Sequence, residues 1–273
     1  MTACINELKE LPPLSTSARE ILKIVHNDDA HVYELTRIIE QDPALLSRII
    51  GLANSAFFGS REVSGVQRAI IDVLGFRTAK NIVLGVVLGG IFNPQKCRSF
   101  DLPRYWFVSL MTATLAKDIA QELKMSSMDA NDAYLSGMLN EVGLMALAYL
   151  YPNKLEAILS EKSSHLAERE KDVFGQSHYE ISAQFLREWQ LPEIVMEVML
   201  ESCHLLKKEC GELCSVICLA HSLANMIYEE APIELGEMSL PKILKHRTGM
   251  IRKIIDKTKG QAGIYREMAS VLS

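Results

Sequence analysis

The stretch Tyr134–Leu150, YLSGMLNEVGLMALAYL, decides the fold of this 273-residue chain. Only Ser136, Asn140 and Glu141 interrupt its apolar residues and glycines. A helix of this composition is apolar on nearly every side, so other helices have to surround it. The sequence therefore predicts a buried central helix over 134–150, within an all-α multi-helix bundle.

The neighbouring Asn140 and Glu141 raise a chemical question inside that helix. Burying an amide beside a carboxylate is unfavourable by several kcal/mol unless both groups find partners. A metal site, a ligand site and hydrogen bonds from neighbouring helices would each supply such partners. The residues alone leave these three alternatives open.

The composition is that of an ordinary globular protein, with 48% hydrophobic and 23% charged residues. The opening segment MTACINELKELPPL lacks the apolar core of an export signal, so we expect a cytoplasmic protein whose six cysteines are free thiols. The longest apolar run, Ile82–Phe92, is shorter than the roughly 20 residues that span a bilayer. We therefore expect no transmembrane segment.

The formal net charge of -5 is unevenly distributed along the chain. Residues 236–273 hold eight Lys/Arg against three Asp/Glu, which leaves residues 1–235 at -10. An acidic body lacks the clustered basic face that nucleic-acid binding requires, so nucleic acid is not an expected partner. The tail has a helical apolar stripe among its lysines and arginines, which indicates either packing on its own domain or docking to an acidic partner.

The remaining sequence predicts helices joined by short connections, without the alternation of a strand. Asp42 and Pro43 are typical of a helix start, with Asp42 as the N-cap and Pro43 at the first helical position. The segment 92–104, FNPQKCRSFDLPR, combines two prolines with no helical period and indicates an internal boundary. Three glycines in the preceding apolar run favour the close approach of another helix; they are Gly85, Gly89 and Gly90.

Several blocks, in this order, resemble the HDOD family, the bacterial HD-related output domain. They are LPPL (11–14), IIEQDPALLSRIIGLANSAFFG (38–59), AIIDVLGF (69–76), YWFVSLMTATLAKDIA (105–120), LSGMLNEVG (135–143), HYEISAQFLREWQLPEIV (178–195) and CLAHSLAN (218–225). The motif positions carried over from the family are Asp42, Pro43, Asn54, Ser55, Gly59, Trp106, Trp189 and Pro192. The resemblance implies an HDOD domain over 8–230, with a helical subdomain (8–94) packed on an HD-like subdomain (103–230). Residues 231–273 would form a basic helical extension.

HDOD domains are relatives of the HD phosphohydrolases, in which His and Asp side chains hold one or two divalent metals. At the matching positions this chain has Val108, Asn140, Glu141 and His221, while His178 and His204 match additional histidines of the enzymes. Valine cannot bind a metal, and an amide oxygen is a weak substitute for imidazole. We therefore expect these six positions to be vestigial, with no metal, no cofactor and no catalytic residue.

Two functions are consistent with these residues. The first is a non-catalytic bacterial signal-transduction module that binds a partner protein or a small regulatory ligand; the sequence leaves its identity and the oligomeric state open. The alternative is a metal-dependent phosphohydrolase with a rebuilt site formed by Glu141, His178, His204 and His221. Three such ligands and an open coordination position would suffice for that chemistry.

The cysteines offer a further candidate site near the end of the chain. Cys210, Cys214 and Cys218 recur every four residues and His221 follows, so a single helix would place all four on one face. Zinc or a redox cluster is conceivable there. Free cysteines commonly pack as small apolar residues, however, and no C-x-x-C pair is present. We interpret these cysteines as core residues.

Overall fold

The structure is a computed structural model that describes residues 14–55 except 26 and 28, 63–161 except 93, 166–202, and 210–273 except 237, 239 and 241. Within these ranges the regular structure is entirely helical, which confirms the predicted all-α class. No helix in the same ranges is both long and apolar enough to cross a bilayer. Gly59 and His204 lie outside the described residues.

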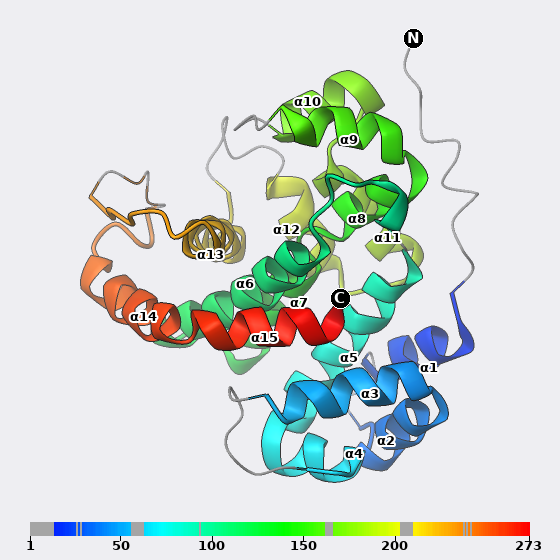
Figure 1. The fold of residues 1–273 in the computed structure, drawn as a ribbon. Coiled ribbons are helices and arrows are strands. Elements are labelled where there is room, and N and C mark those ends of the chain that lie inside the picture. The colour runs from blue at the N-terminus through cyan, green and yellow to red at the C-terminus, as the bar shows by residue number, and fades with distance from the viewer. Residues whose placement is uncertain are drawn as a thin grey trace.

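The N-terminal part packs short helices around one long, apolar helix, α5, which contacts both α1 and α7 (Figure 1). Its elements are α1 (Thr16–Val25), α2 (Val32–Gln41), α3 (Pro43–Ala53), α4 (Val66–Arg68), the π-helical segment η2 (Ala69–Leu74) and α5 (Phe76–Ile91). The predicted start of α3 is confirmed. The Asp42 carboxylate accepts hydrogen bonds from the backbone N–H groups of Ala44 and Leu45, both at 3.1 Å, and Pro43 follows it directly.

Asn54, at the end of α3, closes the connection to α4. Its side-chain amide donates to the carbonyl of Val63 at 2.9 Å, and its Oδ1 accepts from the backbone N–H of Val63 at 2.7 Å. The neighbouring Ser55 is buried. The family motif at this point is therefore structural, because one amide satisfies both backbone groups of a buried residue.

The glycines of α5 allow two other helices to approach it closely. A Cβ atom at Gly89 would lie 2.6 Å from the indole ring of Trp106, and one at Gly85 would lie 2.6 Å from Met138. Real Cβ atoms do not approach other atoms this closely, so glycine is required opposite Trp106. The predicted close approach is confirmed, and it joins the N-terminal helices to the rest of the bundle.

The second part surrounds α6 and α7, which form the most extensive helix pair of the molecule. Its elements are η3 (Pro94–Lys96), α6 (Leu102–Glu122), α7 (Ser127–Leu139), α8 (Val142–Leu150), α9 (Pro152–Ser160), α10 (Leu166–Phe174), α11 (His178–Glu188), α12 (Glu193–Ser202) and α13 (Glu212–Tyr228). The predicted boundary over 92–104 contains only the short turn η3 before Asp101 caps α6. Trp189 stacks on Phe185 at the end of α11, and Pro192 precedes α12.

The prediction of one continuous central helix over 134–150 is wrong, because the helix is interrupted. The backbone leaves the helical conformation at Glu141, with φ at -105° and ψ at 15°, so α7 ends at Leu139 and α8 begins at Val142. Both halves are buried as predicted. The break occurs at the only two adjacent polar residues of the stretch, and it turns Glu141 away from the regular helix surface toward α13.

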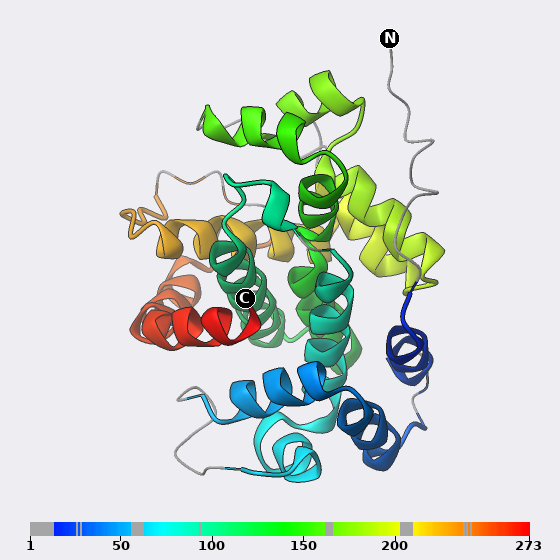
Figure 2. The same cartoon turned by 45° about the vertical axis from the view of Figure 1, so that its right-hand side comes forward.

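The basic tail forms α14 (Thr248–Gly260) and α15 (Ala262–Leu272), which pack on α6. α15 also contacts α3, so that it lies between the two parts of the chain (Figures 1 and 2). Ile251, Ile255 and Tyr265 are buried, and Lys257 forms an ion pair with Asp118 at 2.9 Å. The apolar stripe of the tail thus packs on its own protein. Docking of a partner to its exposed lysines stays a prediction.

The packing of α15 predicts the effect of truncating Tyr265, whose ring is fully buried and lies 6.3 Å from that of Phe107. Tyr265→Ala is expected to lower the free energy of unfolding by about 3–5 kcal/mol, because a large aromatic side chain leaves a cavity. Urea denaturation followed by circular dichroism measures this. Tyr33→Ala, at a side chain that is 72% exposed, is the control and should change it by less than about 0.5 kcal/mol. Equal effects would show that α15 does not pack as described.

Candidate functional site

The candidate site is centred on Glu141, at the break between α7 and α8. Its carboxylate is buried, and Oε1 lies 3.0 Å from Nε2 of His221, which α13 supplies. An ionised carboxylate can only accept hydrogen bonds. Nε2 of His221 is therefore the donor in this contact and carries the proton. The sequence predicted that the two positions belong to one site, and the structure brings them into contact.

Two further side chains extend this contact across the bundle. Asn225, one turn beyond His221, donates to the backbone carbonyl of His221 at 3.0 Å. Arg104 of α6 donates to the amide oxygen of Asn225. A chain of polar groups thus runs from Arg104 through Asn225 and His221 to Glu141, and it links α6, α13 and the α7–α8 junction.

This environment decides the charge of Glu141. Burial alone raises the pKa of the carboxyl, but the hydrogen bond and charge of His221, together with the charges of Arg104 and His178, outweigh burial and lower the pKa to about 2. The carboxylate is therefore ionised at neutral pH. Burial and the charge of Glu141 both raise the pKa of the adjacent Tyr105 phenol.

Gly143 positions α11 against this junction. A Cβ atom at Gly143 would lie 2.0 Å from the backbone carbonyl oxygen of His178, a distance that no side chain can occupy. The backbone N–H of Gly143 donates to Oγ of Ser182 at 2.9 Å, and that hydroxyl in turn donates to the carbonyl of His178. The glycine in the sequence GMLNEVG thus lets the first turn of α11 pack directly on the start of α8.

His178 is fixed by a buried carboxylate that sequence analysis missed. Glu170 of α10 has no exposed surface, and its Oε2 accepts from the backbone N–H of His178 at 2.8 Å and from ring Nδ1 at 2.6 Å. Burial lowers the pKa of His178, but the charge and hydrogen bond of Glu170, and the charge of Glu141, raise it overall. Glu170 occurs among several other charged residues in LAEREKDVF, so no local pattern distinguishes it.

Three buried polar atoms at the junction have no hydrogen-bond partner among the described residues. They are Oδ1 of Asn140, Oε2 of Glu141 and Nε2 of His178. Glu141 therefore finds a protein partner for one oxygen, whereas the amide oxygen of Asn140 finds none. A site of this kind offers hydrogen-bonding capacity to a small polar group that enters it.

The donor set does not fit the divalent metal that the HD-type resemblance implies. Among the described residues, the ligand atoms of Glu141, His178 and His221 do not all lie within 4.8 Å of one another. Val108 is a buried apolar residue of α6, and the nitrogen of His221 that faces Glu141 carries a proton. Three of the four residues predicted for a rebuilt site thus do not form a metal-binding group, and the fourth, His204, lies outside the described residues, so that site stays a prediction.

These features define a class of protein: an all-α bundle whose central helix breaks at a buried carboxylate that is hydrogen-bonded to a histidine of another helix. The model of the HDOD domain family matches residues 11–204, and the chain belongs to this family. The match ends before α13, so the expected domain boundary at residue 230 stays a prediction. An uncharacterised protein of Treponema pallidum (strain Nichols) is 26% identical over 243 residues, which are 86% of this chain and 46% of that protein.

Solved structures show the same fold. A Shewanella amazonensis SB2B protein, whose name assigns it to the phosphohydrolases, is 22% identical with a TM-score of 0.76, over 99% of this chain and 98% of that one. A Marinobacter aquaeolei VT8 protein, whose name assigns it to signal transduction, is 22% identical with a TM-score of 0.74, over 100% of this chain and 62% of that one. The chain thus spans less than two thirds of the length of this protein and of the Treponema relative.

The contact at Gly143 gives a direct test of the junction. Gly143→Ala is expected to lower the free energy of unfolding by at least about 2 kcal/mol, because α11 has to move away from α8. Gly249→Ala is the matched control, since nothing lies within 4 Å of a Cβ atom there; it should leave stability unchanged or raise it by up to about 1 kcal/mol. Chemical denaturation measures both. An unchanged free energy of unfolding in Gly143→Ala would contradict the described packing.

The lowered pKa of Glu141 predicts a pH dependence of stability. A carboxyl whose pKa is lower in the folded state stabilises the fold above its unfolded pKa, and this contribution is lost as pH falls through the folded value. The free energy of unfolding of the wild type should therefore fall as the pH is lowered from 4.5 to about 2. The part of this fall that protonation of Glu141 causes should be missing in Glu141→Gln. Urea titrations at a series of pH values test this, with Glu188→Gln on the exposed surface as control. Parallel curves for wild type and Glu141→Gln would refute it.

Proposed function

We propose that this protein is a non-catalytic regulatory module that acts in bacterial signal transduction by binding a partner protein or a small regulatory ligand. The observation that carries this proposal is the pairing of Glu141 with His221. A side chain that is ionised, buried and hydrogen-bonded to a protonated nitrogen is engaged in holding helices together. It is not poised to hold a metal with an open position for water.

The unused hydrogen-bonding atoms beside this pair support a binding role. Glu141, Asn140 and His178 each keep one buried polar atom free among the described residues. Leaving such groups unsatisfied is costly, so a ligand or a partner group that reaches them would gain binding free energy. The name of the Marinobacter protein, which shares the fold, agrees with a role in signalling.

A second feature supports regulation by a small molecule. A cleft of about 310 Å³ lies where the N-terminal helices, the α6–α7 pair and the C-terminal tail meet. Thr78, Lys117, Tyr134 and Lys257 are among its lining residues. A ligand bound there would contact all three parts of the chain and would change their relative stability.

The alternative is a metal-dependent phosphohydrolase. One observation favours it: Nδ1 of His178 is bonded to Glu170, an arrangement that in metalloproteins orients Nε2 toward a metal. The other ligand-capable side chains do not converge on that nitrogen within the described ranges. The name of the Shewanella protein applies to that protein, and its identity of 22% supports only a shared fold.

Hydrolysis assays separate the two functions. Purified protein is incubated with phosphomonoester, phosphodiester and cyclic dinucleotide substrates in the presence of Mg²⁺, Mn²⁺ or Zn²⁺. The proposal predicts no turnover above that of the buffer with metal, and no difference among wild type, Glu141→Gln and His178→Ala.

The opposite result would establish the phosphohydrolase instead. In that case the wild type and the exposed-surface control Glu188→Gln turn over a substrate, whereas Glu141→Gln and His178→Ala do not. Bound metal without turnover would not decide between them, because the protein has a second group of ligand-capable side chains.

A further inference from the structure

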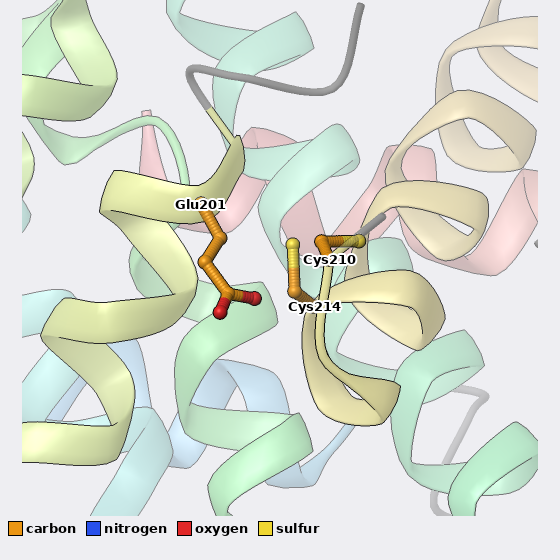
Figure 3. Close-up of side chains that lie close together, drawn as sticks. All are labelled: Glu201, Cys210 and Cys214. Atoms are coloured by element: carbon orange, nitrogen blue, oxygen red, sulfur yellow. The ribbon is translucent and has the colours of Figure 1, made fainter. Parts of the chain in front are cut away.

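A second group of ligand-capable side chains lies between α12 and α13, distinct from the Glu141 site. Glu201 comes from the last turn of α12, Cys210 immediately precedes α13, and Cys214 belongs to the first turn of α13 (Figure 3). One ligand atom from each lies within 4.8 Å of the other two. In the part of the chain that the structure describes, no other group of three or more His, Cys, Asp or Glu side chains has its ligand atoms this close together.

Cys218 adds a third sulfur to the group. Its Sγ is 3.7 Å from that of Cys214, one helical turn away. Tetrahedral zinc binds thiolate at about 2.3 Å, which separates two sulfur ligands by about 3.8 Å. The Sγ atoms of Cys214 and Cys218 thus lie at the spacing of two sulfur ligands in a tetrahedral coordination shell.

The carboxylate of Glu201 is held in place by the backbone. Its Oε2 accepts a hydrogen bond from the N–H of Gly211 at 2.9 Å, at the N-cap of α13. The other oxygen is not needed for that bond and is available as a ligand. An oriented carboxylate beside three sulfurs is a donor set that a zinc-type ion accepts, whereas Mg²⁺ and Ca²⁺ prefer oxygen ligands alone.

The group lies beside the start of α13 and is open to solvent at two of its sulfurs. The N-terminus of α13 carries a partial positive charge close to Cys210 and Cys214. The exposure of Cys210 and Cys218 is intermediate, so an ion can reach them from solvent.

We propose that Glu201, Cys210, Cys214 and Cys218 bind one thiophilic divalent cation of the zinc type. The ion joins the end of α12 to the start of α13, which are separated in sequence by residues 203–209. It is independent of the Glu141 site, because His221 of the same helix faces Glu141. Cys210 lies outside α13, so one helix does not carry all three cysteines with His221 as expected, and a glutamate of another helix completes the group.

Cobalt titration of the reduced, full-length protein tests this site, since Co²⁺ reports thiolate ligation and tetrahedral geometry by its absorption. Stoichiometric Co²⁺ should produce a sulfur-to-metal charge-transfer band and visible d–d bands, both abolished by equimolar Zn²⁺. Cys214→Ser should remove the charge-transfer band, and Glu201→Gln should weaken Zn²⁺ binding at least about tenfold, or about 1.4 kcal/mol. Cys97→Ser, a buried cysteine outside the group, is the matched control and should retain the spectrum.

A second measurement needs no variant. Alkylation of the wild-type protein followed by mass spectrometry should show that Zn²⁺ protects Cys210, Cys214 and Cys218 while leaving the labelling of Cys97 unchanged. Equal labelling with and without Zn²⁺, or a Co²⁺ spectrum that Cys210→Ser and Cys214→Ser both leave intact, would overturn the proposal. A disulfide between two of these cysteines formed in air, with no metal uptake, would assign the group to thiol redox chemistry instead.

The outcome is separable from that of the hydrolysis assays. Metal that is lost in Cys214→Ser but retained in His178→Ala belongs to the sulfur site and leaves the non-catalytic proposal standing. Metal with the opposite dependence belongs to the Glu141 site and overturns the sulfur proposal.

Discussion

The structure depends on satisfying one buried negative charge, that of Glu141. A carboxylate in the middle of a helical core is tolerated only if a partner neutralises it and accepts the geometry that the backbone allows. Here the backbone provides the geometry by leaving the helix at Glu141, and His221 provides the partner. The break, the contact of Glu141 with His221 and the orientation of α13 are therefore one feature, since removing His221 would leave an uncompensated charge at the centre of the bundle.

A second buried pair, His178 with Glu170, has a different consequence. It attaches α10 to the N-terminus of α11, and Gly143 lets that end of α11 contact α8 directly. The two pairs converge on the same junction, and both histidines come from helices that follow it in sequence, α11 and α13. Their charges also act on each other: the charge of His178 lowers the pKa of Glu141, and the charge of Glu141 raises that of His178. A polar group that entered the junction would thus affect both pairs at once.

The sequence was informative wherever local chemistry determines structure. The all-α class, the start of α3 at Asp42 and Pro43, and the close approach at Gly85 and Gly89 were all predictable, because capping and the absence of a Cβ atom act locally. The break at Glu141 was not predicted. The periodicity of residues 134–150 predicts one continuous helix, whereas the break results from a contact of Glu141 with His221. Glu170 and Glu201 were missed for the same reason: each gains its role from a residue of another element.

The two sites also differ in what their residues can still do, and this difference bears on function. At the Glu141 site, the carboxylate already accepts a hydrogen bond from His221, so a cation would have to displace a favourable internal contact before binding. At the sulfur site, the carboxylate is oriented by a backbone N–H, and its neighbours are polarisable sulfurs at coordination spacing. A cation would therefore compete with His221 for the carboxylate of Glu141 at the first site. At the second site its ligands would already be oriented. On this argument the residues of the Glu141 junction serve helix packing, while the proposed cation would join the end of α12 to the start of α13.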